Sequence, residues 1–313
     1  MNPQLLWDWM IERQSIYLRR QLNPDNQSAW TSDPIFQQYS FCNVFREQDR
    51  VTQWIKQYIR EPFADHRNLW FLLCVARQIN WPHTLSALLT SSGLPDCWYP
   101  HRACNILLRR QAEGHKVYTG AYMLRGDIQK NDGTSNDKPT YTCFKVLDPV
   151  YVAVDNMGVD PMELGHPLSS SIQSATEYLE SFHGWGGFLA YEVATDLRHT
   201  RYLRDAPDVM TWANPGPGAK RGLNRIFGRE VKKALPRKQA MEEIQQLLEM
   251  AIKVMPGWMA PRTTGFHRAD DLPLLEMRDI EHSLCEMDKY QRVLLGEGRP
   301  RATFKPQKEN WLK

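Results

Sequence analysis

The sequence predicts a mostly α-helical protein with a small β insert. Apolar residues recur at helical spacing, as at Val51, Trp54 and Ile55, and proline or glycine signals bound most of these segments. Residues 115–147 instead contain β-favouring runs around a polar loop. A chain of 313 residues with 42% hydrophobic content can bury a substantial core.

The expected helices follow from these signals. Residues 4–22 form an amphipathic pattern that stops at Asn23 and Pro24, and Thr31 to Pro34 supplies a capping residue and a helix-start proline. The other expected helices cover residues 51–59, 66–79, 82–92, 100–113, 148–156, 171–182, 187–203, 219–234, 238–254 and 278–295.

The β-favouring runs are His115 to Leu124 and Thr140 to Leu147. The chain is expected to be one catalytic unit, with an N-terminal helical part at 1–114, the insert at 115–147 and a basic tail at 297–313. A helix-hairpin-helix part and the C-terminal helices are expected at 148–296.

Composition limits the classes of function. The net charge of +3 is small, but residues 216–238 carry eight Lys or Arg against the single acid Glu230. Six scattered cysteines without a C-x-x-C pair favour free thiols over disulfides or zinc. No apolar run is long enough for a membrane span, and the N-terminal segment does not resemble a signal peptide, so a cytoplasmic protein is expected.

The segment from Phe182 to Ala190 matches a helix-hairpin-helix element. Gly184, Gly186 and Gly187 lie in its turn, where backbone N–H groups at the start of the second helix can face a DNA phosphate. A glycine-rich turn between packed helices is the structural alternative.

A basic helix follows the hairpin. Arg221, Arg225 and Arg229, with Lys232 or Lys233, recur along one stripe without interleaved acids. Such a stripe repels itself, and a polyanion would relieve the repulsion. A solvated charged face is the alternative interpretation.

The loop from Gly216 to Gly222 precedes this helix. Its Gly216 and Gly218, together with Lys220 and Arg221, suit phosphate oxygens, although the loop lacks the Walker A spacing. In helix-hairpin-helix DNA glycosylases a catalytic Asp occupies this place. Here the loop has no carboxylate, so it is expected to receive an anion.

Three further segments carry chemical groups. Asn43, Arg46 and Asp49 lie beside an aromatic face, Asp196 lies within the second hairpin helix, and residues 283–290 combine acids, Lys289 and Tyr290. A buried structural ion pair is the default interpretation for each. No metal-ligand cluster is apparent from spacing.

Five motifs in order resemble a phage DNA base hypermodification family, the alpha-glutamyl/putrescinyl thymine pyrophosphorylases or amino acid:DNA transferases. They extend from Trp30 to Tyr290. The motifs are Trp30-Thr31-x-Asp33-Pro34, Phe41-x-Asn43-Val44-x-Arg46-x-x-Asp49-Arg50, Ala190-Tyr191 with Asp196-Leu197, Gly216-Pro217-Gly218-Ala219-x-Arg221-Gly222 and Leu284-Cys285-Glu286-x-Asp288-Lys289-Tyr290.

This resemblance implies a DNA-modifying transferase on a helix-hairpin-helix DNA glycosylase-like scaffold of two helical subdomains. It would replace the pyrophosphate on a 5-hydroxymethyluracil base in double-stranded DNA with an amine. The donor would be an amino acid such as glycine or glutamate, or a polyamine such as putrescine. A separate DNA base kinase would prepare the substrate, and the sequence leaves open whether Mg²⁺ assists.

The expected site residues fall into four groups. The catalytic group is Asp196, Glu286, Asp288 and Lys289. The pyrophosphate group is Gly216, Gly218, Lys220 and Arg221. The DNA-binding group is Gly184, Gly186, Gly187, Arg225, Arg229 and Lys232. The base or donor pocket is Trp30, Asp33, Asn43, Arg46 and Tyr191, and no metal ligand is expected.

Two other functions stay open at this point. One is a glycosylase-like base-excision enzyme, which the missing loop carboxylate disfavours. The other is a non-catalytic DNA-binding partner of a base-modification kinase. The sequence contains no kinase P-loop.

Overall fold

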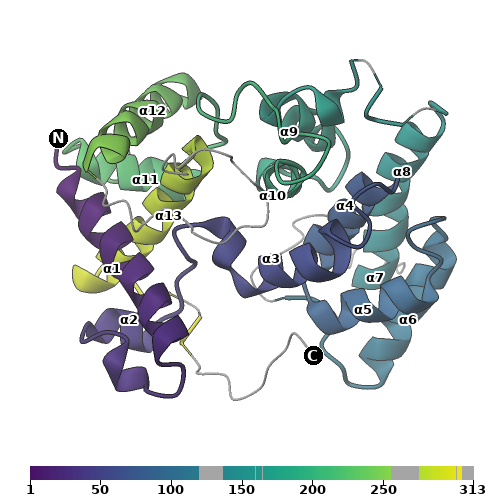
Figure 1. Ribbon diagram of the computed structural model, residues 1–313, viewed down its shortest axis with the longest axis horizontal. Coiled ribbons are helices and arrows are strands. Elements are labelled where there is room, and N and C mark those ends of the chain that lie inside the picture. Colours follow the sequence, from purple (N-terminus) through teal and green to yellow (C-terminus); the bar gives the residue numbers. More distant parts are fainter. Residues whose placement is uncertain (120–136, 159, 164, 255–274, 301, 305–313) are drawn as a thin grey trace. The chain divides into compact units, whose positions relative to one another are not determined.

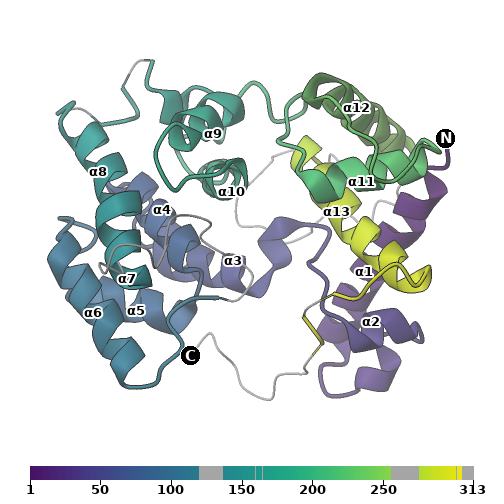
Figure 2. The same ribbon diagram turned by 180° about the vertical axis from the view of Figure 1, so that it is seen from behind.

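The computed structural model describes residues 1–119, 137–158, 160–163, 165–254, 275–300 and 302–304. The chain separates into two compact units (Figures 1 and 2). Unit 1 comprises Met1–Asp49 and Val209–Lys313, and unit 2 comprises Arg50–Asp208. The predicted division at residues 114 and 148 falls inside unit 2.

Unit 1 is organised around helix α13. Helices α1, α2, α11 and α12 all contact it. The bounds of these helices are α1 (Gln4–Leu22), α2 (Pro34–Gln38), α11 (Pro217–Ile226), α12 (Arg237–Val254) and α13 (Met277–Leu294), with short 3₁₀ turns at Gln27–Ala29 and Arg46–Gln48. Ile280, Leu284 and Met287 of α13 are fully buried, so this helix forms the centre of the unit's core.

Unit 2 is built around helix α4 (Leu69–Ile79), all of whose residues are buried. Helix α10 packs against both α4 and α9. The remaining elements are α3 (Arg50–Ile55), π-helix η3 (Lys56–Arg60), α5 (Pro82–Ser91), α6 (Pro100–Ala112), α7 (Lys138–Thr140), π-helix η4 (Tyr141–Leu147), α8 (Asp148–Asp155), 3₁₀ turn η5 (Pro167–Ser169), α9 (Ile172–Glu180) and α10 (Gly187–Leu197).

Local chemistry explains the helix boundaries. The Asp33 carboxylate accepts hydrogen bonds from the backbone N–H groups of Ile35 and Phe36 and so caps α2. Proline occupies the first turn of α5, α6 and α11, where its missing N–H costs nothing. Helix α4 ends at Asn80, whose φ of 47° is left-handed.

Three predictions about secondary structure are wrong. The helix predicted at 187–203 ends at Leu197. Thr140 to Leu147, predicted as a strand, is helical, and its burial in η4 overrides the β-favouring character of its residues. The basic helix predicted to reach residue 234 ends at Ile226, because Gly228 takes a φ of 67° and breaks it.

The described residues contain no strand, and Tyr39 and Thr303 form an isolated antiparallel bridge. A strand was also predicted from His115 to Leu124. Residues 115–119 of this run do not form a strand, and residues 120–124 lie outside the described residues. None of the helices in the described part of the chain is long and apolar enough to cross a membrane.

Candidate functional site

The predicted phosphate loop begins helix α11 in unit 1. Gly216 is the N-cap residue, and no side chain caps the helix start. A Cβ atom at Gly218 would collide with the Cys285 thiol, and one at Gly222 would lie 2.5 Å from the Leu284 carbonyl oxygen. These two glycines therefore let α11 approach α13 closely, a structural reason for glycine that does not involve a phosphate.

The arginine stripe is neutralised by acids from other elements. Arg221 and Arg225 donate to the buried Asp288 carboxylate at 2.8 and 2.9 Å, and Arg292 lies 3.5 Å from it. Arg225 also pairs with Glu297. The self-repulsion expected from a stripe without interleaved acids is therefore relieved at Arg221 and Arg225 by acids that are distant in sequence.

Arg229 lies beyond the end of α11 and turns toward α12. Its two terminal nitrogens each lie 2.6 Å from a carboxylate oxygen of Glu243, and its Nε donates to Asn224. This fork geometry is the strong form of an arginine–carboxylate pair. Arg229 consequently ties the loop after α11 to α12.

The lysines of the same segment differ from the arginines. Lys232, Lys233 and Lys238 are exposed and Lys220 is half-buried. Within the described part of the chain, none of the four forms an ion pair with an acid. Unlike Arg221, Arg225 and Arg229, these four lysines therefore keep a positive charge that no acid in the described part of the chain neutralises.

A second acidic position of α13, Glu286, binds the segment that follows α2. Its Oε2 accepts the Cys42 backbone N–H at 2.9 Å and the Lys289 ammonium at 2.6 Å. Burial alone would lower the pKa of Lys289, but the charge of Glu286 raises it above its ordinary value. Burial raises the pKa of the Cys42 thiol, and the carboxylates of Glu286 and Asp49 raise it further.

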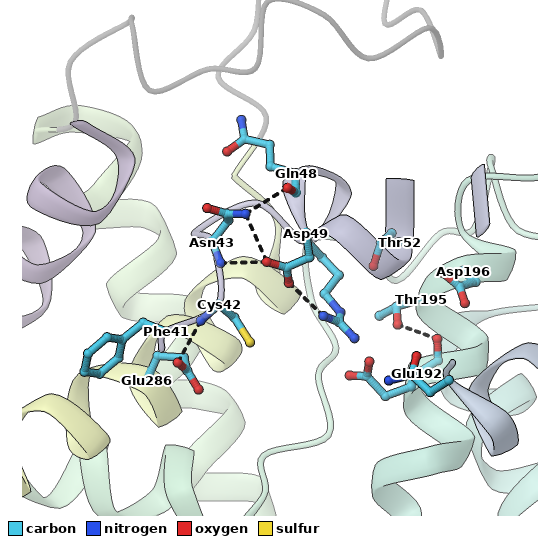
Figure 3. A network of polar contacts seen from close by, with 12 residues as sticks. Phe41, Cys42, Asn43, Gln48, Asp49, Thr52, Glu192, Thr195, Asp196 and Glu286 are labelled. Atoms are coloured by element: carbon cyan, nitrogen blue, oxygen red, sulfur yellow. Dashed lines mark hydrogen bonds and ion pairs between the residues drawn. The ribbon is translucent and has the colours of Figure 1, made fainter. Parts of the chain in front are cut away.

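The predicted group of Asn43, Arg46 and Asp49 converges in one network, in which Figure 3 labels Asn43 and Asp49. Asp49 Oδ1 accepts from the backbone and side-chain nitrogens of Asn43 at 2.9 and 3.0 Å. Its Oδ2 accepts from Arg46 at 2.7 Å. Arg13 also contacts this segment by donating to the carbonyls of Cys42 and Phe41, and its burial lowers its pKa to about 10.

The aromatic residues predicted for a base pocket are occupied within the protein. Trp30 is buried beneath Arg20 and Phe304, and its indole N–H donates to the Asn23 carbonyl. Asp33, besides capping α2, accepts a 2.6 Å hydrogen bond from the Tyr290 hydroxyl. These contacts give two of the five residues predicted for the pocket, Trp30 and Asp33, a structural role in unit 1.

In unit 2, Asp196 forms a buried ion pair. Both of its oxygens accept from Arg77, at 2.5 and 2.6 Å, and neither side chain is more than 2% exposed. Arg77 also donates to Thr52 at 3.1 Å. Tyr191, predicted for the base pocket, is 3% exposed on the same helix, and its carbonyl accepts from Thr195.

The predicted hairpin is formed by α9, a turn and α10. Gly184 has a φ of 80° and lies against Val146, while the buried Trp185 donates its indole N–H to the Val146 carbonyl at 3.0 Å. No atom lies within 4 Å of a Cβ built on Gly186, and no side chain caps α10. Gly184 thus packs the turn against Val146, whereas the space around the Cα of Gly186 is open.

Several residues of this arrangement were not predicted from the sequence. Arg13, Glu243 and His282 contribute to unit 1 through folding contacts, for which sequence spacing carries no signal. Arg292 was detectable, because it lies at i+4 from the predicted Asp288 and the two side chains share one helix face.

The fold and the site define a helical protein in which Arg221, Arg225 and Arg229 are paired with acids of unit 1, while Lys220, Lys232, Lys233 and Lys238 have no acidic partner among the described residues. A family model described as "5-hmdU DNA kinase, helical domain" matches residues 2–299. The 5-hmdU DNA kinase of Bacillus phage SP10 is 26% identical over 308 residues, which cover 92% of this chain and 45% of that protein. No solved structure matches significantly.

The chain belongs to the family of 5-hmdU DNA kinase helical domains. Since 5-hydroxymethyl-2′-deoxyuridine is a modified thymidine, the coarser expectation of a family linked to modified thymine in phage DNA is confirmed. The expected pyrophosphate-replacing transferase is wrong, and so is the glycosylase alternative, because the matching family is that of a kinase. The residue roles that depended on that reaction, binding a pyrophosphate and binding an amine donor, are therefore withdrawn.

Proposed function

We propose that this chain holds DNA containing 5-hydroxymethyluracil and presents the hydroxymethyl group for phosphorylation, as the helical part of a 5-hmdU DNA kinase. The family match supports the substrate. The chain spans 45% of the length of the SP10 relative. The 313 residues contain no G-x-x-x-x-G-K-S/T sequence, and the proposal concerns the DNA side of the reaction.

The observation that carries the proposal is the set of lysines without acidic partners. Lys232, Lys233 and Lys238 are exposed around the start of α12, while Arg221, Arg225 and Arg229 are neutralised within unit 1. Lysines placed in this way bind phosphates as point charges and release counterions from DNA. This separation of roles supports DNA backbone binding by the lysines.

The hairpin of unit 2 is proposed as a second contact with the DNA backbone. The start of α10 has no side-chain cap, and the position next to Gly186 is open. The partial positive charge at a helix N-terminus favours a phosphate oxygen. In this proposal the hairpin acts as a helix-hairpin-helix element, and Gly184 serves to shape the turn.

Binding is tested by fluorescence anisotropy with duplexes that contain either 5-hydroxymethyluracil or thymine. The variant with Lys232→Ala, Lys233→Ala and Lys238→Ala should bind more weakly, and its salt dependence should lose about 2 to 3 in log–log slope, since each phosphate contact contributes about 0.9. A matched control removes three exposed charges elsewhere, by Arg109→Ala, Lys145→Ala and Lys253→Ala.

The control should bind as the wild type does. Equal affinity and slope for the two triple variants would contradict the lysine assignment, and failure of the wild type to bind modified duplex would contradict the proposed function.

Presentation for phosphorylation is tested with a chimaera in which this chain replaces the matching part of the SP10 kinase. With ATP and Mg²⁺ the chimaera should phosphorylate 5-hydroxymethyluracil in DNA, detected by mass spectrometry of the nucleosides. A folded chimaera that binds this DNA but transfers no phosphate would reject the proposal that the chain presents the base.

A further inference from the structure

Three side chains of unit 1 that differ in chemistry bring their donor atoms together. The thiol of Cys42, a carboxylate oxygen of Asp49 and a ring nitrogen of His282 all lie within 4.8 Å of one another. Cys42 and Asp49 lie between α2 and α3, and His282 lies on α13. All three are half-buried, so they are accessible to a small ion and partly shielded from water.

The supporting contacts orient two of these side chains. Cys42 is held through its backbone, because its N–H donates to Glu286 and its carbonyl accepts from Arg13. Asp49 Oδ1 accepts two hydrogen bonds from Asn43, which occupy both of its lone pairs. Oδ2 accepts one hydrogen bond, from Arg46, among the described residues. One lone pair of Oδ2 is therefore available, and such hydrogen bonds to a ligating carboxylate are usual around metal sites.

The donor set selects the class of metal. Sulfur, imidazole nitrogen and a carboxylate oxygen together suit Zn²⁺, whereas Mg²⁺ and Ca²⁺ prefer oxygen ligands. Tetrahedral zinc with bonds of about 2.0 to 2.3 Å places its ligand atoms roughly 3.3 to 3.8 Å apart. The three donor atoms thus reach this geometry if the distances between them shorten by about 1.5 Å or less.

We propose that Cys42, Asp49 and His282 bind one Zn²⁺ ion, with water in the fourth position. The Cys42 thiol gives its proton to solvent as the sulfur–zinc bond forms. Bound zinc would join the segment between α2 and α3 to α13, the central helix of unit 1. This inference is independent of the proposed DNA binding.

The test uses the full chain, freed of metal with a chelator and titrated with Co²⁺ as a spectroscopic substitute for Zn²⁺. We expect one equivalent to bind, with sulfur-to-cobalt charge-transfer absorption and the intense visible bands of four-coordinate cobalt. Zinc should displace the cobalt and should raise the midpoint of thermal unfolding.

The variants separate this site from other thiols. Cys42→Ser should abolish the charge-transfer band, and Asp49→Asn and His282→Gln should weaken cobalt binding at least tenfold. Cys97→Ser, which removes an exposed thiol in unit 2, is the matched control and should retain the wild-type spectrum.

Circular dichroism establishes which variants are folded. If Cys42→Ser is unfolded, the spectra of Asp49→Asn and His282→Gln decide the question. Absence of stoichiometric cobalt binding by the wild type, or a wild-type spectrum in any folded variant of the three ligands, would overturn the proposal. Loss of the charge-transfer band in Cys97→Ser would overturn it as well.

Discussion

At the residue scale, the main finding is that ionic side chains in both units stabilise the fold. Asp196 and Asp288 were both predicted to be catalytic, and each is a buried carboxylate held by arginine. Burial of a carboxylate is costly unless partners compensate for the lost hydration. These residues can therefore be tested first by stability and only then by activity.

Replacement of Asp196 by Asn should lower the free energy of unfolding by about 3 to 5 kcal/mol, because Arg77 then remains charged and buried without its partner. Urea denaturation measures this change. Asp155→Asn is the control, since its pair with Arg67 is about half exposed, and the change should be less than about 1 kcal/mol. Equal effects in the two variants would contradict the structural role of the Arg77–Asp196 pair.

The pair of Lys289 and Glu286 predicts a dependence of stability on pH. The folded pKa of Lys289 lies above its ordinary value of 10.5. The ammonium is therefore more firmly protonated in the folded protein, and its contribution is complete below pH 10.5 and is lost as pH rises through the folded pKa.

Lys289→Met should therefore destabilise the protein at neutral pH, and its difference from the wild type should shrink only above pH 10.5. Urea denaturation of both proteins across this range provides the measurement. A difference that already disappears below that pH would show that the ion pair is not responsible.

At the element scale, α11 and α13 pack closely because Gly218 and Gly222 of α11 have no side chain at the contact. Gly222→Ala should destabilise the protein by about 1 to 3 kcal/mol, because its Cβ would press on the Leu284 carbonyl. Gly216→Ala is the matched control, since the space around its Cβ is open, and it should have little effect. Thermal unfolding distinguishes the two, and equal midpoints would contradict the packing role.

The helices themselves were largely predictable from the sequence. The helix expected at 4–22 is α1 with the same bounds, and the prolines at residues 82 and 100 begin α5 and α6 as expected. These boundaries depend on local chemistry that neighbouring residues determine. The segment from Thr140 to Leu147 was not predictable in this way, because β-branched residues pack equally well in a buried helix when tertiary contacts require it.

The candidate site was predictable only in part. Asn43, Arg46 and Asp49 lie within a few residues of one another, and their clustering was anticipated. The acids that neutralise the arginines and the position of His282 beside Cys42 depend on contacts between distant segments. Periodicity describes one helix at a time and cannot identify the partner that another helix supplies.

At the scale of the whole molecule, the two units differ in how the chain builds them. Unit 2 is one continuous segment, whereas unit 1 combines residues from both ends of the chain. A fragment of residues 50–208 should therefore fold by itself into a helical protein with cooperative thermal unfolding, measured by circular dichroism. A fragment that ends at residue 180 lacks α10, which packs on α4 and α9, and should not unfold cooperatively. Failure of the longer fragment to fold would show that unit 2 needs unit 1.

The split construction of unit 1 has a consequence for biosynthesis. Helix α1 is translated before unit 2, whereas α13, which it packs against, is translated after unit 2. The apolar face of α1 therefore stays exposed while the whole of unit 2 is synthesised. Domains generally fold as units in the order in which they emerge. Unit 2 is thus expected to fold before unit 1 is complete, and chaperones that bind nascent chains can bind α1 during that interval.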